Sequence, residues 1–380
     1  MENNTGKVKQ LFLNLTAVVI GCLIFFAVLE VVVRVGRLEG EVFITLDPCV
    51  GHINKPRISG THVFADDKNF VEFNSRGFHD VDHSITPKEG VKRVLLIGDS
   101  FTEALQVKRS EIFSRLLENN LSEAKIPTEV ISLGISSYGT DQALMMYRCV
   151  GRLYKPDLVL LNFSPNDSGD NYFKKSPYKP QFYEENGKLI LDESYVANVE
   201  NRIKERTSFS KEGVLFWIKE NSYAARYLKK KYDIIAANRI AKNSNDLARN
   251  TVALVKKVND EEQAKAWSLT ARLIEELNKE VKQDGAKLVV VKIPGQPEFI
   301  EELKKIVTNI DDYDPSIARK TLKNISDSRG IGYLDLQDAI ERGGKFEDLY
   351  FPVDKHWKVK GHEVASEEIA NFILDKNLLK

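Results

Sequence analysis

The chain has 380 residues, of which 42% are hydrophobic and 29% are charged, which allows one large domain or two ordinary ones with a sizeable core. Lys and Arg together number 55, as do Asp and Glu, so the formal net charge is zero. Because a general nucleic-acid binder normally carries a basic excess, this balance argues against nucleic acid as a partner.

The first element is an apolar run of 23 residues, 11–33, which is long enough to cross a hydrocarbon core of about 30 Å as a helix. Glu30 lies four residues before Arg34, where a helical ion pair neutralises it. No small-residue cleavage site follows the run. We therefore predict a tail over residues 1–10 and an uncleaved transmembrane signal anchor over 11–34, with the buried helix of a soluble protein as the alternative.

The orientation of this anchor is only weakly encoded, because Lys7 and Lys9 precede the run while Arg34 and Arg37 follow it. A short amino terminus before a large domain favours a cytoplasmic amino terminus. We therefore expect a single-pass membrane protein whose large domain lies outside the cytoplasm.

A lead-in segment over residues 35–90 is broken by frequent Pro and Gly and contains apolar pieces typical of short strands. It also carries four histidines at irregular spacing, which favours local hydrogen bonding over a metal site. They are His52, His62, His79 and His83. We expect this segment to pack on the domain that follows.

Five short apolar runs with helical segments between them then predict an α/β domain over residues 91–380, built on a parallel sheet. The runs are Val94–Ile97, Val130–Leu133, Leu158–Phe163, Leu288–Ile293 and Tyr333–Leu336. The first run has no polar alternation, which is typical of a strand buried on both faces.

An insertion over about residues 168–282 separates the third run from the fourth. Asn186-Gly187 between apolar residues predicts a β-hairpin. The basic run Lys229–Lys231 is interpreted as a solvated face rather than a contact with anionic lipid. Trp217 and Trp267 are interpreted as core residues rather than as substrate platforms. We expect the insertion to form a cap that shapes substrate choice.

The three cysteines, Cys22, Cys49 and Cys149, form no CxxC pattern and no cluster with histidine, which argues against a structural zinc site. Cys49 and Cys149 can pair in an oxidising compartment. Two free buried thiols are the interpretation that such scattered cysteines favour.

Polar residues follow three of the predicted strands, where open α/β sheets place their ligand sites. Ser100 sits at a strand-to-helix turn, Ser137 and Gly139 follow the second run, and Asn166 follows the third. A helix cap at Ser100 and a simple Asx turn at Asn166 are the structural alternatives. Backbone N–H groups and an Asn amide are suitable donors for a developing oxyanion.

A fourth stretch, after the last run, contains Asp354, His356 and, further on, His362. A serine hydroxyl needs a base to take its proton, and that histidine needs a carboxylate to hold its tautomer. Asp354 and His356 are two residues apart, so the carboxylate reaches the ring only if the loop bends. For either histidine, the alternative is a solvated side chain at the surface.

Together these four stretches resemble the SGNH (GDSL-type) hydrolase superfamily over roughly residues 93–372, with the insertion outside the resemblance. The resemblance implies a three-layer, flavodoxin-like fold. It also implies a catalytic Ser100, His356 and Asp354, with oxyanion donors from Ser100, Asn166 and either Ser137, where the family's glycine falls, or Gly139. The Asp354-x-His356-Trp357 block is similar to that of membrane-associated members and polysaccharide O-acetyltransferase relatives.

The resemblance implies a membrane-anchored serine esterase that acts on an ester or on an acylated glycan or lipid, without metal or organic cofactor. The first alternative is O-acyl transfer to a cell-envelope or secreted glycan, which requires an acyl-donor membrane protein as partner. The second alternative is a non-catalytic binding protein that keeps the fold.

Overall fold

The computed structural model describes residues 2–64, 67–173, 176–241, 255–257 and 261–380. The chain divides into a smaller unit, Met1–Val42 with Lys204–Ser244, and a larger unit, Phe43–Ile203 with Asn245–Lys380. The predicted insertion is therefore shared between the two units. Residues 174–175, 242–254 and 258–260 of that insertion lie outside the described residues.

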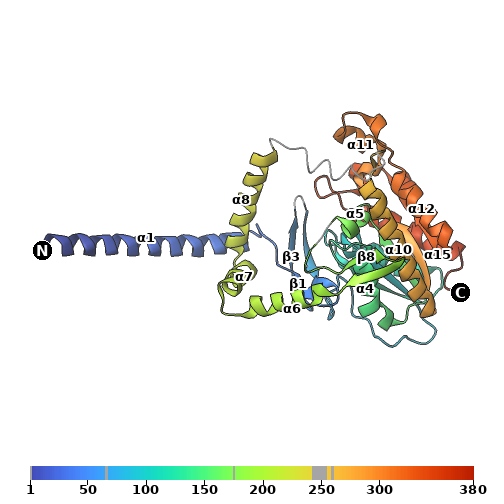
Figure 1. The fold of residues 1–380 in the computed structure, drawn as a ribbon, viewed down its shortest axis with the longest axis horizontal. Coiled ribbons are helices and arrows are strands. Elements are labelled where there is room, and N and C mark those ends of the chain that lie inside the picture. Colours follow the sequence, from blue (N-terminus) through green and yellow to red (C-terminus); the bar gives the residue numbers. More distant parts are fainter. Residues whose placement is uncertain (1, 65–66, 174–175, 242–254, 258–260) are drawn as a thin grey trace. The chain divides into compact units, whose positions relative to one another are not determined.

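The smaller unit contains the long helix α1 (Glu2–Val35) and the shorter helices α7 (Lys211–Asn221) and α8 (Tyr223–Ala241), drawn in blue and yellow in Figure 1. The part of α1 from Lys7 to Val35 is long and apolar enough to cross a membrane. Only 6% of its most apolar stretch is buried. A core helix of a soluble protein would bury its apolar side chains, so α1 has the character predicted for a membrane-spanning helix.

The larger unit is built on five parallel strands in the order β11-β10-β7-β5-β6. All five predicted runs are confirmed as strands; β7 has the predicted ends, and the ends of the other four differ by one or two residues. The strands are β5 (Lys92–Gly98), β6 (Thr128–Gly134), β7 (Leu158–Phe163), β10 (Lys287–Lys292) and β11 (Gly332–Asp335).

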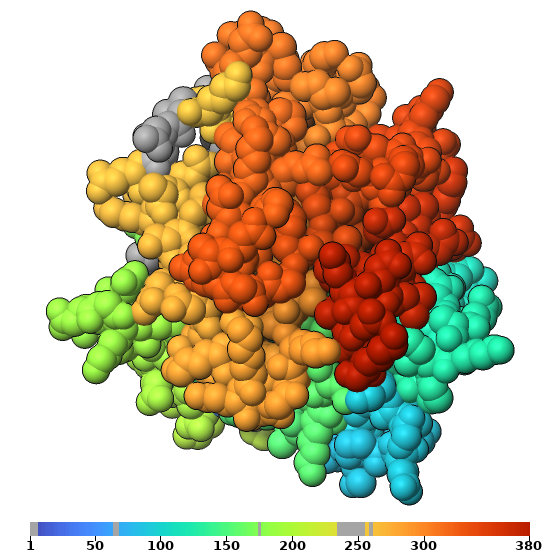
Figure 2. Space-filling view, turned by 90° about the vertical axis from the view of Figure 1, so that its right-hand side faces the viewer, coloured from blue at the N-terminus to red at the C-terminus, as the bar shows by residue number. Residues whose placement is uncertain are grey.

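Helices cover both faces of this sheet, which confirms the predicted three-layer α/β fold. Leu95 and Ile97 of β5 point into one core, whereas Val94 and Leu96 point into the other. The first core is covered by α4 (Thr140–Cys149), α10 (Glu261–Gln283) and α12 (Ile317–Arg329), and the second by α3 (Phe113–Glu123), α13 (Gln337–Gly343) and α15 (Val359–Asp375). Figure 2 shows the orange and red carboxyl-terminal third of the chain spread over one side of this unit.

Smaller elements complete the larger unit. The lead-in forms two antiparallel pairs, and the predicted hairpin is confirmed with Asn186 and Gly187 at φ 51° and 73° in its turn. The remaining elements are β1 (Ile44–Asp47), β2 (Gly51–Asn54), β3 (Ser59–Phe64), β4 (Asp67–Glu72), α2 (Ser100–Glu103), α5 (Asp167–Tyr172), β8 (Gln181–Glu185), β9 (Lys188–Asp192), α6 (Ser194–Thr207), α11 (Ile300–Ile306) and α14 (Phe346–Leu349).

Cys49 and Cys149 form a disulfide, with their Cα atoms 6.6 Å apart, so the interpretation as free thiols is wrong. The two residues meet because the lead-in packs against α4, where the side-chain amide of Gln142 donates to the carbonyl of Val50. The two cysteines are 100 residues apart in the sequence, so no local pattern indicated that they are close in space. Cys22 is exposed on α1.

The interpretation of Trp217 as a core residue is also wrong, since its surface is 64% exposed. Trp267 is partly buried and stacks on Phe163 at the edge of the first core, as expected. Trp217 belongs to the smaller unit, whose described elements are helices, whereas Trp267 belongs to the larger unit with the sheet.

Candidate active site

Ser100 is the first residue of α2, directly after β5. The Asp99 carboxylate caps this helix by accepting the N–H of Phe101 at 3.0 Å, and the Ser164 hydroxyl donates to the same carboxylate at 2.9 Å. A Cβ on Gly134 would lie 2.3 Å from the backbone nitrogen of Glu103, so only glycine lets β6 approach the turn this closely. The turn is therefore held from both sides, and Asp99 rather than Ser100 is the cap.

The structure brings Ser100, His356 and Asp354 together. The Oγ of Ser100 lies 2.7 Å from Nε2 of His356, and Nδ1 of His356 lies 3.1 Å from Oδ1 of Asp354. The side chain of Asp354 is buried, while that of His356 keeps 20% of its surface exposed. Each imidazole nitrogen thus faces a different partner, as a base between a nucleophile and a carboxylate requires.

A bend at Lys355 lets two residues so close in sequence meet side by side. Lys355 adopts φ 65°, in the left-handed region. The loop is closed by the Phe351 N–H, which donates to the carbonyl of His356 at 2.9 Å. Trp357 is buried against the rings of Phe101 and Phe113 and fixes the far end of the loop.

The pKa of His356 reflects opposed influences. Burial disfavours the imidazolium, but the hydrogen bond and charge of Asp354, with the charge of Asp99, outweigh burial and raise the pKa above its usual 6.5. Burial raises the pKa of Asp99 in turn, although the charge of His356 opposes this. The site therefore favours a proton on His356, which is the state that follows attack by a serine hydroxyl.

His362 lies outside the site. Its ring is buried and stacks on Phe113 with 5.9 Å between centroids, and Nδ1 faces the Phe113 N–H at 3.4 Å. The idea of a solvated surface histidine is wrong for His362. Burial, helped by the charges of His356 and His79, lowers its pKa to about 3.

The expected oxyanion donors end up in different surroundings. Ser137 is exposed at φ 68°, a conformation that favours glycine, as the resemblance implies for this position. Gly139 is buried before α4. The amide of Asn166, at the start of α5, donates to the carboxylate of Asp170 at 3.0 Å. This bond uses one of the two N–H groups of the Asn166 amide.

Sequence reasoning missed a group of buried charges at this edge of the sheet. Asp141 pairs with Lys179 at 2.7 Å, and Lys179 also donates to the carbonyl of Asp170 at 2.6 Å. Burial, with the charges of Asp99 and Asp170, raises the pKa of Asp167 well above its usual range. Asp167 follows Asn166 in a recognisable block, but no pattern marked Lys179, which the insertion supplies.

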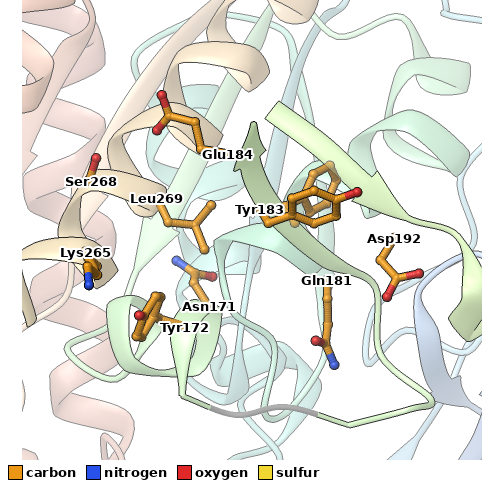
Figure 3. A pocket seen from close by; sticks show the side chains of 10 residues that line it. Asn171, Tyr172, Gln181, Tyr183, Glu184, Asp192, Lys265, Ser268 and Leu269 are labelled. Carbon is orange, nitrogen blue, oxygen red and sulfur yellow. The ribbon is translucent and has the colours of Figure 1, made fainter. Parts of the chain in front are cut away.

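A cavity of about 400 Å³ opens between α5, the β8–β9 hairpin and α10. Figure 3 shows Tyr172 and Lys265 on one side of it and Tyr183 and Asp192 on the other. Asn171 of this lining approaches Gly139, since its Oδ1 would lie 2.6 Å from a Cβ there, but Ser100, His356 and Asp354 are not among the lining residues. The lining combines aromatic rings with hydrogen-bonding side chains.

Within the described ranges, no three His, Cys, Asp or Glu side chains are grouped so that they could hold a metal ion. Within the described residues, none of the four lead-in histidines belongs to a group that could hold a metal ion. For example, His83 lies between Asp80 and Glu129, with ring nitrogens 3.0 and 2.9 Å from their carboxylates.

Residues 253–380 match the family ALGX, described as "SGNH hydrolase-like domain, acetyltransferase AlgX". No curated protein matches the chain in sequence. Solved structures that resemble it include TesA, at 12% identity and a TM-score of 0.41 over 76% of this chain and all of that one. Esterase EstA from Pseudoalteromonas sp. is 12% identical, with a TM-score of 0.39 over 75% of this chain and 98% of that one. The acetyl xylan esterase AlAXEase is 11% identical, with a TM-score of 0.39 over 74% of this chain and 99% of that one. Over residues 253–380 the chain is therefore similar to an SGNH hydrolase-like domain.

Proposed function

We propose that this chain is a serine ester hydrolase that uses Ser100, His356 and Asp354 as its catalytic triad. The observation that carries the proposal is the continuous contact from Ser100 Oγ through both nitrogens of His356 to the buried Asp354. His356 accepts the proton as Ser100 attacks the ester carbonyl, and then donates it to the leaving alcohol. Asp354 holds the ring and stabilises its charged form.

The oxyanion of the tetrahedral intermediate would be stabilised by donors at the same edge of the sheet. These are the N–H of Ser100, the N–H of Ser137 or Gly139, and the amide of Asn166. Water then releases the acyl group from Ser100, with His356 again acting as base.

Substitution of the nucleophile tests this assignment directly. We expect Ser100→Ala to remove turnover of p-nitrophenyl acetate, butyrate and octanoate, because Ala has no hydroxyl to form the acyl-enzyme. The circular dichroism spectrum should stay unchanged. Ser110→Ala, at an exposed residue, is the matched control and should keep wild-type turnover. Full activity of Ser100→Ala would refute the assignment.

A second candidate function is O-acyl transfer to a glycan. It is favoured by the description of the matching family and by the cavity in Figure 3, whose tyrosines and polar side chains suit a sugar. Product analysis with and without a glycan acceptor distinguishes transfer from hydrolysis. Transfer would need an acyl donor, which a separate membrane protein would have to supply.

Two features support a membrane-anchored catalytic unit outside the cytoplasm. Helix α1 has the length and composition of a membrane span, and the Cys49–Cys149 disulfide is of the kind that persists in oxidising compartments. In a non-catalytic binding protein, the Ser100 hydroxyl would not react as a nucleophile. Labelling by a fluorophosphonate probe would exclude that role, and failure of the folded chain to label would favour it.

A further inference from the structure

Helix α7 in the smaller unit turns its apolar side outward. Val214, Leu215, Trp217 and Ile218 are exposed by 50, 56, 64 and 37%. With 3.6 residues per turn, these four positions lie on one side of the helix. A water-facing helix normally presents polar residues, so this face is matched to a less polar environment.

The opposite side of α7 is fixed by contacts within the same unit. The helix is capped by Ser210, whose hydroxyl accepts the N–H of Gly213 at 3.2 Å. Gly213 lies so close to Ser208 that a Cβ would be 1.9 Å from its carbonyl oxygen. Phe216 lies under the guanidinium of Arg206, 4.6 Å from the ring centre. The apolar face therefore cannot turn inward without breaking these contacts.

The end of α7 and the start of α8 are attached to the last turns of α1. The Glu30 carboxylate accepts the N–H groups of Tyr223 and Ala224 at 3.1 and 2.8 Å and the hydroxyl of Ser222 at 3.0 Å. Arg34 donates to the carbonyl of Asn221 at 2.8 Å. Helix α8 consequently lies across the end of α1 (Figure 1). If α1 crosses a membrane, this attachment places α7 and α8 at its surface.

A groove of about 650 Å³ runs between α7 and α8. Leu215, Ile218 and Ala225 supply apolar lining, while Lys219, Lys229 and Lys230 supply positive charge. The side chain of Lys229 is 70% exposed and forms an ion pair with Asp233 at 2.7 Å, and that of Lys230 is 41% exposed and lies 3.9 Å from Glu39. A lipid phosphate would therefore compete with these two carboxylates for the lysines. Apolar lining beneath lysines is complementary to a phospholipid, with its acyl chain inside and its phosphate at the rim.

We propose that α7 and the first half of α8 bind the surface of the membrane that α1 spans. Trp217 and its apolar neighbours would enter the boundary between headgroups and acyl chains, where tryptophan is favoured, and the lysines would contact anionic phosphates. Lipid is the occupant because the junction between α7 and α8 is held against the last turns of α1 by Glu30 and Arg34. The proposal rests on the anchoring proposed above, and it revises the interpretation of Lys229–Lys231 as a solvated face.

The test uses the full chain in lipid nanodiscs made with brominated or ordinary phosphatidylcholine, each with and without phosphatidylglycerol. Bromine in the acyl chains quenches only tryptophans that reach them. We expect the tryptophan fluorescence of the wild type to be lower in brominated discs than in ordinary discs. The fluorescence of Trp217→Phe should be the same in both kinds of disc. Trp267 and Trp357 belong to the larger unit and contribute equally in both proteins.

The charges are tested with the double variant Lys229→Gln and Lys230→Gln. Phosphatidylglycerol should increase quenching of the wild type more than that of this variant. Lys320→Gln, on an exposed lysine of α12, is the control and should behave as wild type.

Equal quenching of wild type and Trp217→Phe would overturn the proposal, and crosslinked dimers in that case would assign the face to a second copy. A chain that does not co-purify with the discs would refute the anchoring itself. Membrane retention with no Trp217 quenching would refute only the surface contact.

Discussion

At the scale of single residues, His356 decides the pH dependence of the proposed chemistry. A general base must be neutral, and the contacts with Asp354 raise the pKa of His356 above 6.5. We therefore expect kcat/KM for p-nitrophenyl acetate to rise with pH, with a midpoint above 6.5. Asp354→Asn should move this midpoint down and lower the rate, because the charge that favours the imidazolium is gone. A wild-type midpoint below 6.5 would contradict this interpretation.

His362 should affect stability rather than catalysis. Its folded pKa of about 3 lies below the unfolded value near 6.5, so its contribution to stability is complete above pH 6.5 and is lost as pH falls toward 3. His362→Gln should reduce the slope of the free energy of unfolding against pH by up to about 1.4 kcal/mol per unit. Urea unfolding of the full chain at pH 7 and 5 measures this slope.

Turnover provides the contrast between the two histidines. We expect His356→Ala to lose several orders of magnitude in rate, as loss of a triad base usually does, whereas His362→Gln keeps most activity. The reverse ranking would move the base from His356 to His362. An unchanged unfolding slope in His362→Gln would instead contradict only the burial argument.

At the scale of elements, the loop between α14 and α15 carries two of the three proposed catalytic side chains. Its bend depends on Lys355 at φ 65°, a conformation that costs a β-branched residue roughly 1–3 kcal/mol. We expect Lys355→Ile to separate Asp354 from His356 and to lower kcat about 10-fold or more, on the scale of 1.4 kcal/mol per factor of ten.

Lys355→Gly is the matched variant, because it also removes the amine but accepts the left-handed conformation without strain. It should keep near wild-type kcat. If both variants lost activity equally, the contact of the Lys355 amine with the ring of Phe346 would matter more than the bend.

At the scale of the whole molecule, the Cys49–Cys149 disulfide ties the lead-in to the helical layer over the sheet. It closes a loop of 100 residues, and removing a bond of this kind typically costs about 2–5 kcal/mol. We expect Cys149→Ser, or a reductant, to lower the melting temperature of the full chain. Cys22→Ser, on α1, should leave it unchanged. Equal melting temperatures for Cys149→Ser and wild type would contradict this role.

The organisation into units also belongs to this scale. The sequence presented residues 168–282 as one insertion, yet the structure assigns Lys204–Ser244 to the unit that contains α1. Glu30 accounts for this assignment, because its carboxylate accepts backbone N–H groups at the start of α8, nearly two hundred residues later in the chain. The predicted ion pair of Glu30 with Arg34 is confirmed at 2.6 Å, but the sequence did not indicate the additional contact with the start of α8.

The sequence alone determined the features that depend on neighbouring residues. Short apolar runs predicted all five strands, and the lack of polar alternation in Val94–Ile97 predicted a strand covered on both faces. Asn186-Gly187 predicted the hairpin, because its turn needs positive φ. The alternation of strands and helices also implied that Ser100 and Asn166 follow strands whose carboxyl ends lie at the same edge of the sheet.

Only the tertiary structure decided the contacts between distant segments. It brought His356 rather than His362 to Ser100, because Lys355 bends one loop while Phe113 encloses the other ring. It paired Cys49 with Cys149 and exposed Trp217, against expectation. Burial and pairing depend on which surfaces meet, and that is set by packing over the whole chain rather than by the identity of a residue and its neighbours.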